Sequence, residues 1–404
     1  MHGTQHLLEI FFLLAAAQLS GRLFQRFGQP AVIGQLLAGI VVGPSLLGLA
    51  HEGEILAFLA ELGAIFLLFM VGLEVRLRDI LSVGKEAFAV AIIGVSFPFA
   101  AGYAYGLFIG FEQLPALFLG TALVATSVGI TAAVLQEIGV LSRTYSRIIL
   151  GAAVIDDVLG LIVLAVVSGV AQTGSVEPAA IAQLSLLSLA FVAGAMLLVP
   201  AVRRIPLEKL PFGGPFSVAL TLAVGMAGLA TAIGLAPIVG AFFAGMLLAE
   251  VREDYDLDGP THALELFLTP LFFAMIGVRL DLGSLLDPMT LAIGGVASAI
   301  AIACKLLGGI GALTRGARRA VLVGVGMVPR GEVGLIVAAI GLSAGAVDQR
   351  EYAVVLLVVL VTTLVVPFTL RPLINWAEAS PRDENENDAD ADSAAGDGLA
   401  SADR

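Results

Sequence analysis

Long apolar segments recur from one end of this chain to the other, and they decide what it can fold into. The 404 residues are 58% hydrophobic and only 13% charged, whereas soluble domains carry about 25% charged residues. An apolar stretch of about 18 or more residues is long enough to cross a bilayer as a helix. The segments are too long, and alternate too little, for the strands of a transmembrane barrel. The sequence therefore predicts an all-α polytopic membrane protein.

The hydropathy pattern predicts about 13 transmembrane helices. We expect spans at 6–26, 30–48, 54–74, 86–109, 115–136, 147–170, 179–201, 214–233, 237–251, 262–280, 289–313, 319–342 and 352–375. Most lysines and arginines fall on one side if the N-terminus lies outside, and such basic loops mark the cytoplasmic side. The C-terminus is then cytoplasmic. No basic residues precede the first span, so it does not have the pattern of a cleaved signal peptide.

The chain divides into a transmembrane domain at 1–377 and a polar tail at 378–404. The tail holds nine acidic residues, two arginines and few hydrophobic residues. Such a composition cannot bury enough apolar surface to fold, so we expect a disordered acidic tail in the cytoplasm. The single cysteine, Cys304, excludes a disulfide within the chain.

Three short segments recur in the same order at an offset of 205 or 206 residues. The pairs are VIGQLLAG (32–39) with IVGAFFAG (238–245), FMVGLEVRL (69–77) with AMIGVRLDL (274–282), and TSVGI (126–130) with GEVGL (331–335). A single pair of this length could arise by chance, but three in one order argue for an internal duplication.

The duplication predicts a first repeat at about 6–170, a linker helix at about 179–201 and a second repeat at about 214–375. Each repeat holds six spans and so returns the chain to the side on which it began. The linker crosses once more, so the two repeats have inverted topology. Inverted repeats are the architecture of many secondary transporters, with the ion site near the membrane midplane where the repeats meet.

Two adjacent aspartates, Asp156 and Asp157, lie inside the apolar segment GAAVIDDVLGLIVLAVV. A charge at the centre of a span costs about 2.5–3.5 kcal/mol on the insertion scale and is normally paired or functional. Measured from the cytoplasmic ends of their spans, Lys305 lies at the depth of Asp156 within about one turn. Neighbouring residues on a helix point about 100° apart. One aspartate can therefore face Lys305 while the other faces a water-filled cavity.

This charged set can exchange protons for a cation, because carboxylate and hydroxyl oxygens are suitable ligands for a hard monovalent ion such as Na⁺. The alternative is a buried salt bridge that only joins helices. For Lys305 a stabilising ion pair with Asp156 would by itself be a sufficient explanation.

The third repeated pair places further polar residues at the same depth. Thr126 and Ser127 lie within ATSVGIT, and Arg330 and Glu332 lie within MVPRGEVGL beside a proline and a glycine. Proline and glycine both disfavour the helix interior, so these spans are candidates for unwound, crossing helices. The alternative is a kinked but continuous helix with its hydroxyls bonded to its own backbone. Arg330 and Glu332 are expected to neutralise helix dipoles or to link spans.

Together, ATSVGITAAVLQEIG, GAAVIDDVLGLIVLAVV, Lys305 and MVPRGEVGLI resemble the cation/proton antiporter-2 family, and most closely its NapA-type Na⁺/H⁺ antiporters. The resemblance extends to about residue 376. It implies a NhaA-like fold of thirteen helices with crossed discontinuous helices. It also implies a homodimer and an elevator movement of a core domain.

The resemblance also implies a role for each site residue. Asp157 is then the principal Na⁺ ligand, and Asp156 pairs with Lys305. The lysine releases its proton when Na⁺ binds. Thr126 and Ser127 belong to the unwound helix of the core. A paired-aspartate site is typical of electrogenic exchange.

We therefore expect a Na⁺(Li⁺)/H⁺ antiporter of a bacterial inner membrane. Its partners would be membrane lipids, monovalent cations, protons and a second copy of the chain, with no nucleic acid. The metal at Asp156 and Asp157 would be transported Na⁺, and no cofactor is expected. The sequence contains no Walker loop, Rossmann fingerprint or nucleophile elbow, so enzyme activity is not expected. K⁺/H⁺ exchange, a gated channel or sensor, and Na⁺/organic-anion symport remain alternatives.

Overall fold

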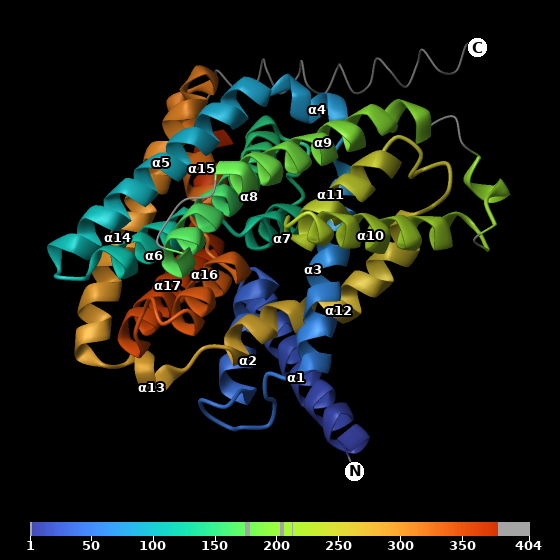
Figure 1. The fold of residues 1–404 in the computed structure, drawn as a ribbon. Helices are drawn as coiled ribbons and strands as arrows, with labels where there is room; N and C mark the ends of the chain where they lie inside the picture. The colour runs from blue at the N-terminus through green and yellow to red at the C-terminus, as the bar shows by residue number, and fades with distance from the viewer. Residues whose placement is uncertain (1, 174–177, 203–205, 212, 379–404) are drawn as a thin grey trace.

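The computed structural model describes residues 2–173, 178–202, 206–211 and 213–378, so the predicted tail beyond Glu378 lies outside the described residues. Helices and their connections make up this whole described part (Figure 1). Within these described residues, ten helical segments are long and apolar enough to cross a membrane, and three shorter apolar helices lie at Ala31–Val42, Pro237–Leu248 and Val333–Leu342. All thirteen predicted spans overlap helices, but which of the short ones cross the bilayer stays a prediction.

The helices pack into two bundles, and most contacts lie within one or the other. We call the first the frame bundle; it contains α1 (His2–Arg26), α2 (Ala31–Val42), α3 (Glu54–Glu74), α10 (Pro215–Ala232), α11 (Pro237–Leu248) and α12 (Asp258–Val278). We call the second the site bundle; it contains α5 (Gly84–Phe108), α6 (Gln113–Val124), α7 (Val128–Ile138), α8 (Thr144–Thr173), α14 (Pro288–Gly308), α15 (Ala317–Gly326), α16 (Glu332–Ser343) and α17 (Gln349–Glu378).

The remaining helices connect these bundles or their members. The long helix α9 (Pro178–Val202) packs on α8 of the site bundle and on α11 of the frame bundle, and it therefore lies between them. Figure 1 shows α9 beside α8. The short elements are α4 (Leu77–Ser82), η1 (Leu207–Lys209), α13 (Leu282–Leu285) and η2 (Gly309–Arg315).

Glycines allow the helices of the frame bundle to cross in close contact. Where α2 crosses α12, a Cβ atom at Gly39 would lie 1.8 Å from the carbonyl oxygen of Ala274. On the opposite helix, a Cβ atom at Gly277 would lie 2.1 Å from the carbonyl oxygen of Leu36. Small residues permit such backbone contacts in membrane helices, which lack a hydrophobic driving force between them.

The same crossing occurs a second time in the frame bundle, between α3 and α11. A Cβ atom at Gly72 or at Gly245 would lie 2.2 or 2.1 Å from a backbone oxygen of the facing helix. Gly245 follows Gly39 by 206 residues, and Gly277 follows Gly72 by 205. The two crossings thus differ by the offset of the repeated segments, which supports an internal duplication.

Two of the predicted spans are interrupted, as the polar residues in them indicate. The first stops at the end of α6 and resumes at α7, which leaves residues 125–127 outside a helix. The second stops at the end of α15 and resumes at α16, which leaves residues 327–331 outside a helix. The alternative of two kinked but continuous helices is therefore wrong. Both interruptions lie in the site bundle.

Candidate functional site

The two helix breaks contact each other directly, although about 200 residues separate them in the sequence. The backbone N–H of Ser127 donates to the carbonyl of Pro329 at 2.7 Å. The hydroxyl of Thr126 donates to the carbonyl of Met327 at 3.3 Å. A Cβ atom at Gly331 would lie 2.6 Å from Oγ of Ser127, so only glycine fits at this crossing. The breaks therefore bring Thr126 and Ser127 against the turn before α16.

Arg330 lies fully buried at this crossing and links both breaks. Its guanidinium donates to the carbonyl of Leu123 at the end of α6 and to the carbonyl of Val328. Carbonyls at the end of a helix lack partners within it and carry the negative end of its dipole. The guanidinium supplies both hydrogen-bond donors and compensating charge. Glu332 begins α16, but its side chain lies outside the described residues.

Thr363, on α17, is a site residue that the sequence analysis missed. Its hydroxyl donates to the carbonyl of Arg330, and its side chain is buried. Thr363 follows Asp157 by 206 residues, so the repeat offset could have found it. The neutral pair Thr362 and Thr363 thus lies one such offset after the charged pair Asp156 and Asp157.

Asp156 and Lys305 form a salt bridge that is completely shielded from solvent. Nζ of Lys305 lies 3.1 Å from Oδ2 and 3.3 Å from Oδ1 of Asp156, and neither side chain is exposed. The aspartate comes from α8 and the lysine from α14. Removing one partner of such a pair leaves the other as an uncompensated buried charge, which costs about 3–5 kcal/mol. Each charge therefore depends on the other.

Asp157 points to a different neighbourhood, at the boundary between the two bundles. It is 7% exposed and lines a cavity of about 10 Å³ whose other lining residues are Leu68, Val128, Leu150, Val154, Ile238, Val239 and Phe242. Such a volume holds about one water molecule. The two aspartates thus face apart, as helix geometry predicts. The cavity at Asp157 is narrower than expected, because apolar side chains of α3 and α11 close it.

The four buried charges of the site compensate one another formally. Asp156 and Asp157 carry two negative charges, and Lys305 and Arg330 carry two positive charges when all four are ionised. Lys305 interacts electrostatically with both aspartates and with Arg330. In a low-dielectric interior, one added cation leaves an excess charge that is costly to keep. The arrangement can therefore couple the arrival of a cation to the loss of a proton.

Gly94 on α5 leaves the space in which the Lys305 ammonium lies, and it is a second residue that the sequence analysis missed. A Cβ atom at this position would lie 3.4 Å from Nζ and 3.7 Å from Cδ of Lys305. A glycine inside an apolar span gives no sequence signal that would distinguish it from a packing residue.

We expect Gly94→Ala to lower the exchange rate several-fold while the protein still folds, because the added methyl would contact the Lys305 ammonium and fill the space in which it can move. The measurement is the initial rate of cation-driven proton release from proteoliposomes. Gly160→Ala is a matched control on α8, since its Cβ atom would lie 3.8 Å from the apolar side chain of Val124 and would not contact a charged group of the site. Equal rates for both variants would contradict a positioning role for Gly94.

Comparison with known proteins shows which family of membrane proteins has this fold and this kind of site. The chain belongs to the transmembrane sodium/hydrogen exchanger family, whose model matches residues 11–376. The predicted membership of a cation/proton antiporter family is therefore confirmed.

Two relatives match nearly the full chain. It is 35% identical to the high-affinity Na⁺/H⁺ antiporter NhaS3 of Synechocystis sp., over 94% of this chain and 92% of that protein. It is 34% identical to the Na⁺/H⁺-K⁺ antiporter GerN of Bacillus cereus, over 90% of this chain and 95% of that protein. The fold resembles that of the sodium proton antiporter MjNhaP1 from Methanocaldococcus jannaschii, with a TM-score of 0.66 over 89% of this chain and 94% of that one, at 16% identity.

Proposed function

We propose that this chain is a secondary antiporter that exchanges Na⁺ or Li⁺ for protons across a bacterial inner membrane, and that the exchange is electrogenic. The observation that carries the proposal is the buried Asp156–Lys305 pair beside a second buried carboxylate, Asp157, at the crossing of two helix breaks. The names of NhaS3 and GerN agree with the proposed cation and with the coupling to protons.

The proposed mechanism is competition between Na⁺ and protons for one site. Na⁺ binds Asp157 with help from oxygen atoms at the break that contains Thr126 and Ser127. The added positive charge loosens the hold of Asp156 on the Lys305 ammonium, and the lysine releases a proton. In the return step, protons reload the aspartates and the lysine. Arg330 keeps the helix ends neutral throughout and is not a carrier.

We further propose that the site bundle moves against the frame bundle in an elevator-type alternating-access cycle. Asp157 lies at the boundary between the bundles, so a modest sliding movement would expose it to one side or the other. The narrow apolar closure around Asp157 fits an occluded arrangement. The frame bundle would also hold the homodimer together, with exposed apolar side chains of α1 facing lipid or the second copy.

The finer architecture belongs to the same proposal. It comprises thirteen membrane helices in a NhaA-like arrangement, a first repeat at 6–170, a linker at 179–201 and a second, inverted repeat at 214–375. The paired glycine crossings at the repeat offset support it. The N-terminus would lie outside and the C-terminus, with its acidic tail, in the cytoplasm.

The test is cation-driven collapse of a pH gradient in proteoliposomes, reported by a pH-sensitive dye. We expect NaCl and LiCl to collapse the gradient and choline chloride to leave it intact. The exchange should also drive a current when the membrane potential is clamped. No response to any monovalent cation between pH 6 and 9 would contradict the proposal and favour a channel or sensor.

K⁺/H⁺ exchange is the second candidate, because the relative GerN is named as a Na⁺/H⁺-K⁺ antiporter. The carboxylate and hydroxyl oxygens of the site suit either ion. Collapse of the gradient by KCl in the same assay would retain the site and mechanism and change the substrate.

A further inference from the structure

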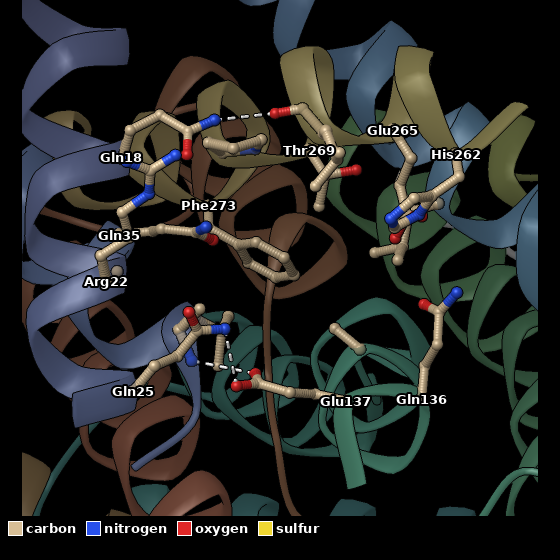
Figure 2. A pocket seen from close by; sticks show the side chains of 17 residues that line it. Gln18, Arg22, Gln25, Gln35, Gln136, Glu137, His262, Glu265, Thr269 and Phe273 are labelled. Atoms are coloured by element: carbon tan, nitrogen blue, oxygen red, sulfur yellow. Dashed lines mark hydrogen bonds and ion pairs between the residues drawn. The ribbon is translucent and has the colours of Figure 1, made fainter. Parts of the chain in front are cut away.

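A second cavity, of about 360 Å³, lies between α1, α2, α7 and α12, and its lining shares no residue with the charged site (Figure 2). Its size is within the range of about 300–1,000 Å³ that is typical of small-molecule sites. Its polar lining residues are Gln18, Arg22, Gln25, Gln35, Gln136, Glu137, His262, Glu265 and Thr269. Phe273 and Leu67 are among its apolar lining residues.

Charges of opposite sign stand on opposite walls of this cavity. Figure 2 shows Arg22 on one wall and Glu265 with His262 on the other. Oε2 of Glu265 lies 3.0 Å from Nδ1 of His262. The Arg22 guanidinium makes no ion pair or side-chain hydrogen bond with the residues that the structure describes. The cavity therefore presents a cationic donor on one side and a carboxylate on the other.

Gln35 is the second feature that indicates a ligand. It is 9% exposed and lines the cavity, and its amide has no hydrogen-bond partner within the described ranges. The amide faces the cavity, where water or a ligand can supply its hydrogen-bond partners. The amide can both donate and accept, so it would serve a ligand that carries both kinds of group.

We propose that this cavity binds a zwitterion, with an acidic oxyanion at Arg22, a primary ammonium at Glu265 and the Gln35 amide between them. A simple anion would be repelled by Glu265 and Glu137, and a simple cation by Arg22. The apolar wall at Phe273 accommodates a hydrocarbon part. Two sources share this chemistry, namely a free amino acid and the ethanolamine headgroup of a phospholipid.

The position of the cavity gives such a ligand a consequence for transport. Glu137, on α7 of the site bundle, accepts hydrogen bonds from Nε2 of Gln25 at 3.0 Å and from the backbone N–H of Ala31 at 2.9 Å, both in the frame bundle. A ligand beside these bonds contacts both bundles and would hinder their relative movement. This consequence depends on the proposed alternating-access function, whereas the binding site itself does not.

The experiment measures the thermal stability of the purified full-length protein and so does not depend on exchange activity. In the lipid arm, the protein is placed in vesicles of phosphatidylethanolamine and phosphatidylglycerol. The control vesicles contain phosphatidylcholine in place of phosphatidylethanolamine, because the quaternary ammonium of choline cannot donate a hydrogen bond to Glu265. The other arm adds phenylalanine, phenethylamine or 3-phenylpropionate to protein in the phosphatidylcholine vesicles.

We expect stabilisation in one arm only, and the arm that responds shows whether the ligand is a phospholipid headgroup or a free amino acid. If the amino-acid arm responds, phenylalanine should bind more strongly than either singly charged analogue. Arg22→Gln and Glu265→Gln should each weaken the effect at least tenfold in apparent affinity, and Gln35→Leu should weaken it less. Arg26→Gln is the matched control, because this arginine lies one turn further along α1 and does not line the cavity. The proposal is overturned if neither arm responds, or if the response persists in both charge variants.

Discussion

Asp157→Asn is expected to abolish Na⁺-driven proton release, with the initial rate falling by at least a hundredfold. The amide keeps the size of the side chain but removes the negative charge that attracts both Na⁺ and the proton. The remaining carboxylate, Asp156, is held by Lys305 at 3.1 Å and is fully buried. It therefore cannot replace Asp157 without leaving the lysine uncompensated.

A binding measurement separates loss of the site from loss of the fold. Ligands that bind only the folded state raise its stability by mass action, so Na⁺ should raise the melting temperature of the wild-type protein and not that of Asp157→Asn. Asp254→Asn is the matched control, because Asp254 is exposed in the loop after α11. Wild-type exchange by the Asp157→Asn protein would exclude this aspartate as the principal ligand.

Lys305→Gln is expected to retain part of the exchange but to lose the net movement of charge. In the proposed cycle the lysine carries a proton that it releases when Na⁺ binds, and glutamine cannot carry one. The measurement is the transient current on a solid-supported membrane, compared with dye-reported proton release in the same preparation. Lys209→Gln, at an exposed position, is the control. Fully electrogenic exchange by Lys305→Gln would refute the carrier role of the lysine.

The stability of the same variants tests the alternative in which the salt bridge only joins helices. Each single substitution, Asp156→Asn or Lys305→Gln, leaves one buried charge and should cost about 3–5 kcal/mol unless that charge is neutralised. The double substitution removes both charges and should recover much of that loss. If the recovered double variant also exchanged Na⁺ electrogenically, the pair would be structural only.

The helical architecture and the identity of the buried charges could be predicted from the sequence. A bilayer requires long apolar helices, because backbone groups in lipid must be satisfied within the segment. A charge inside such a segment is conspicuous, because so few residues of this kind are tolerated there. The depths of the charges predicted that one of the two aspartates faces Lys305. The family resemblance implied that this partner is Asp156, and the structure contains that pair. The polar, proline- and glycine-containing segments also marked both helix breaks.

Other parts of the site had no local signature in the sequence. Gly94 matters because Lys305 lies opposite it on another helix, and this contact cannot be foreseen without the packing. The hydroxyl of Thr363 could equally have bonded to its own helix, as that of Thr362 does. The width of the cavity at Asp157 depends on Phe242 and Ile238, which come from the other bundle.

The sequence by itself determined that this chain crosses the membrane many times, that short segments of it recur at a nearly constant offset, and that a few charges lie within its apolar segments. These properties follow from composition and spacing, because hydrophobic thickness and the cost of a buried charge act on each segment separately. The tertiary structure decided which surfaces meet. It placed the two helix breaks in contact, turned Asp156 and Asp157 to different neighbours, and left Arg22 facing Glu265 across a cavity. Such contacts depend on side-chain packing between distant segments, which no single segment encodes.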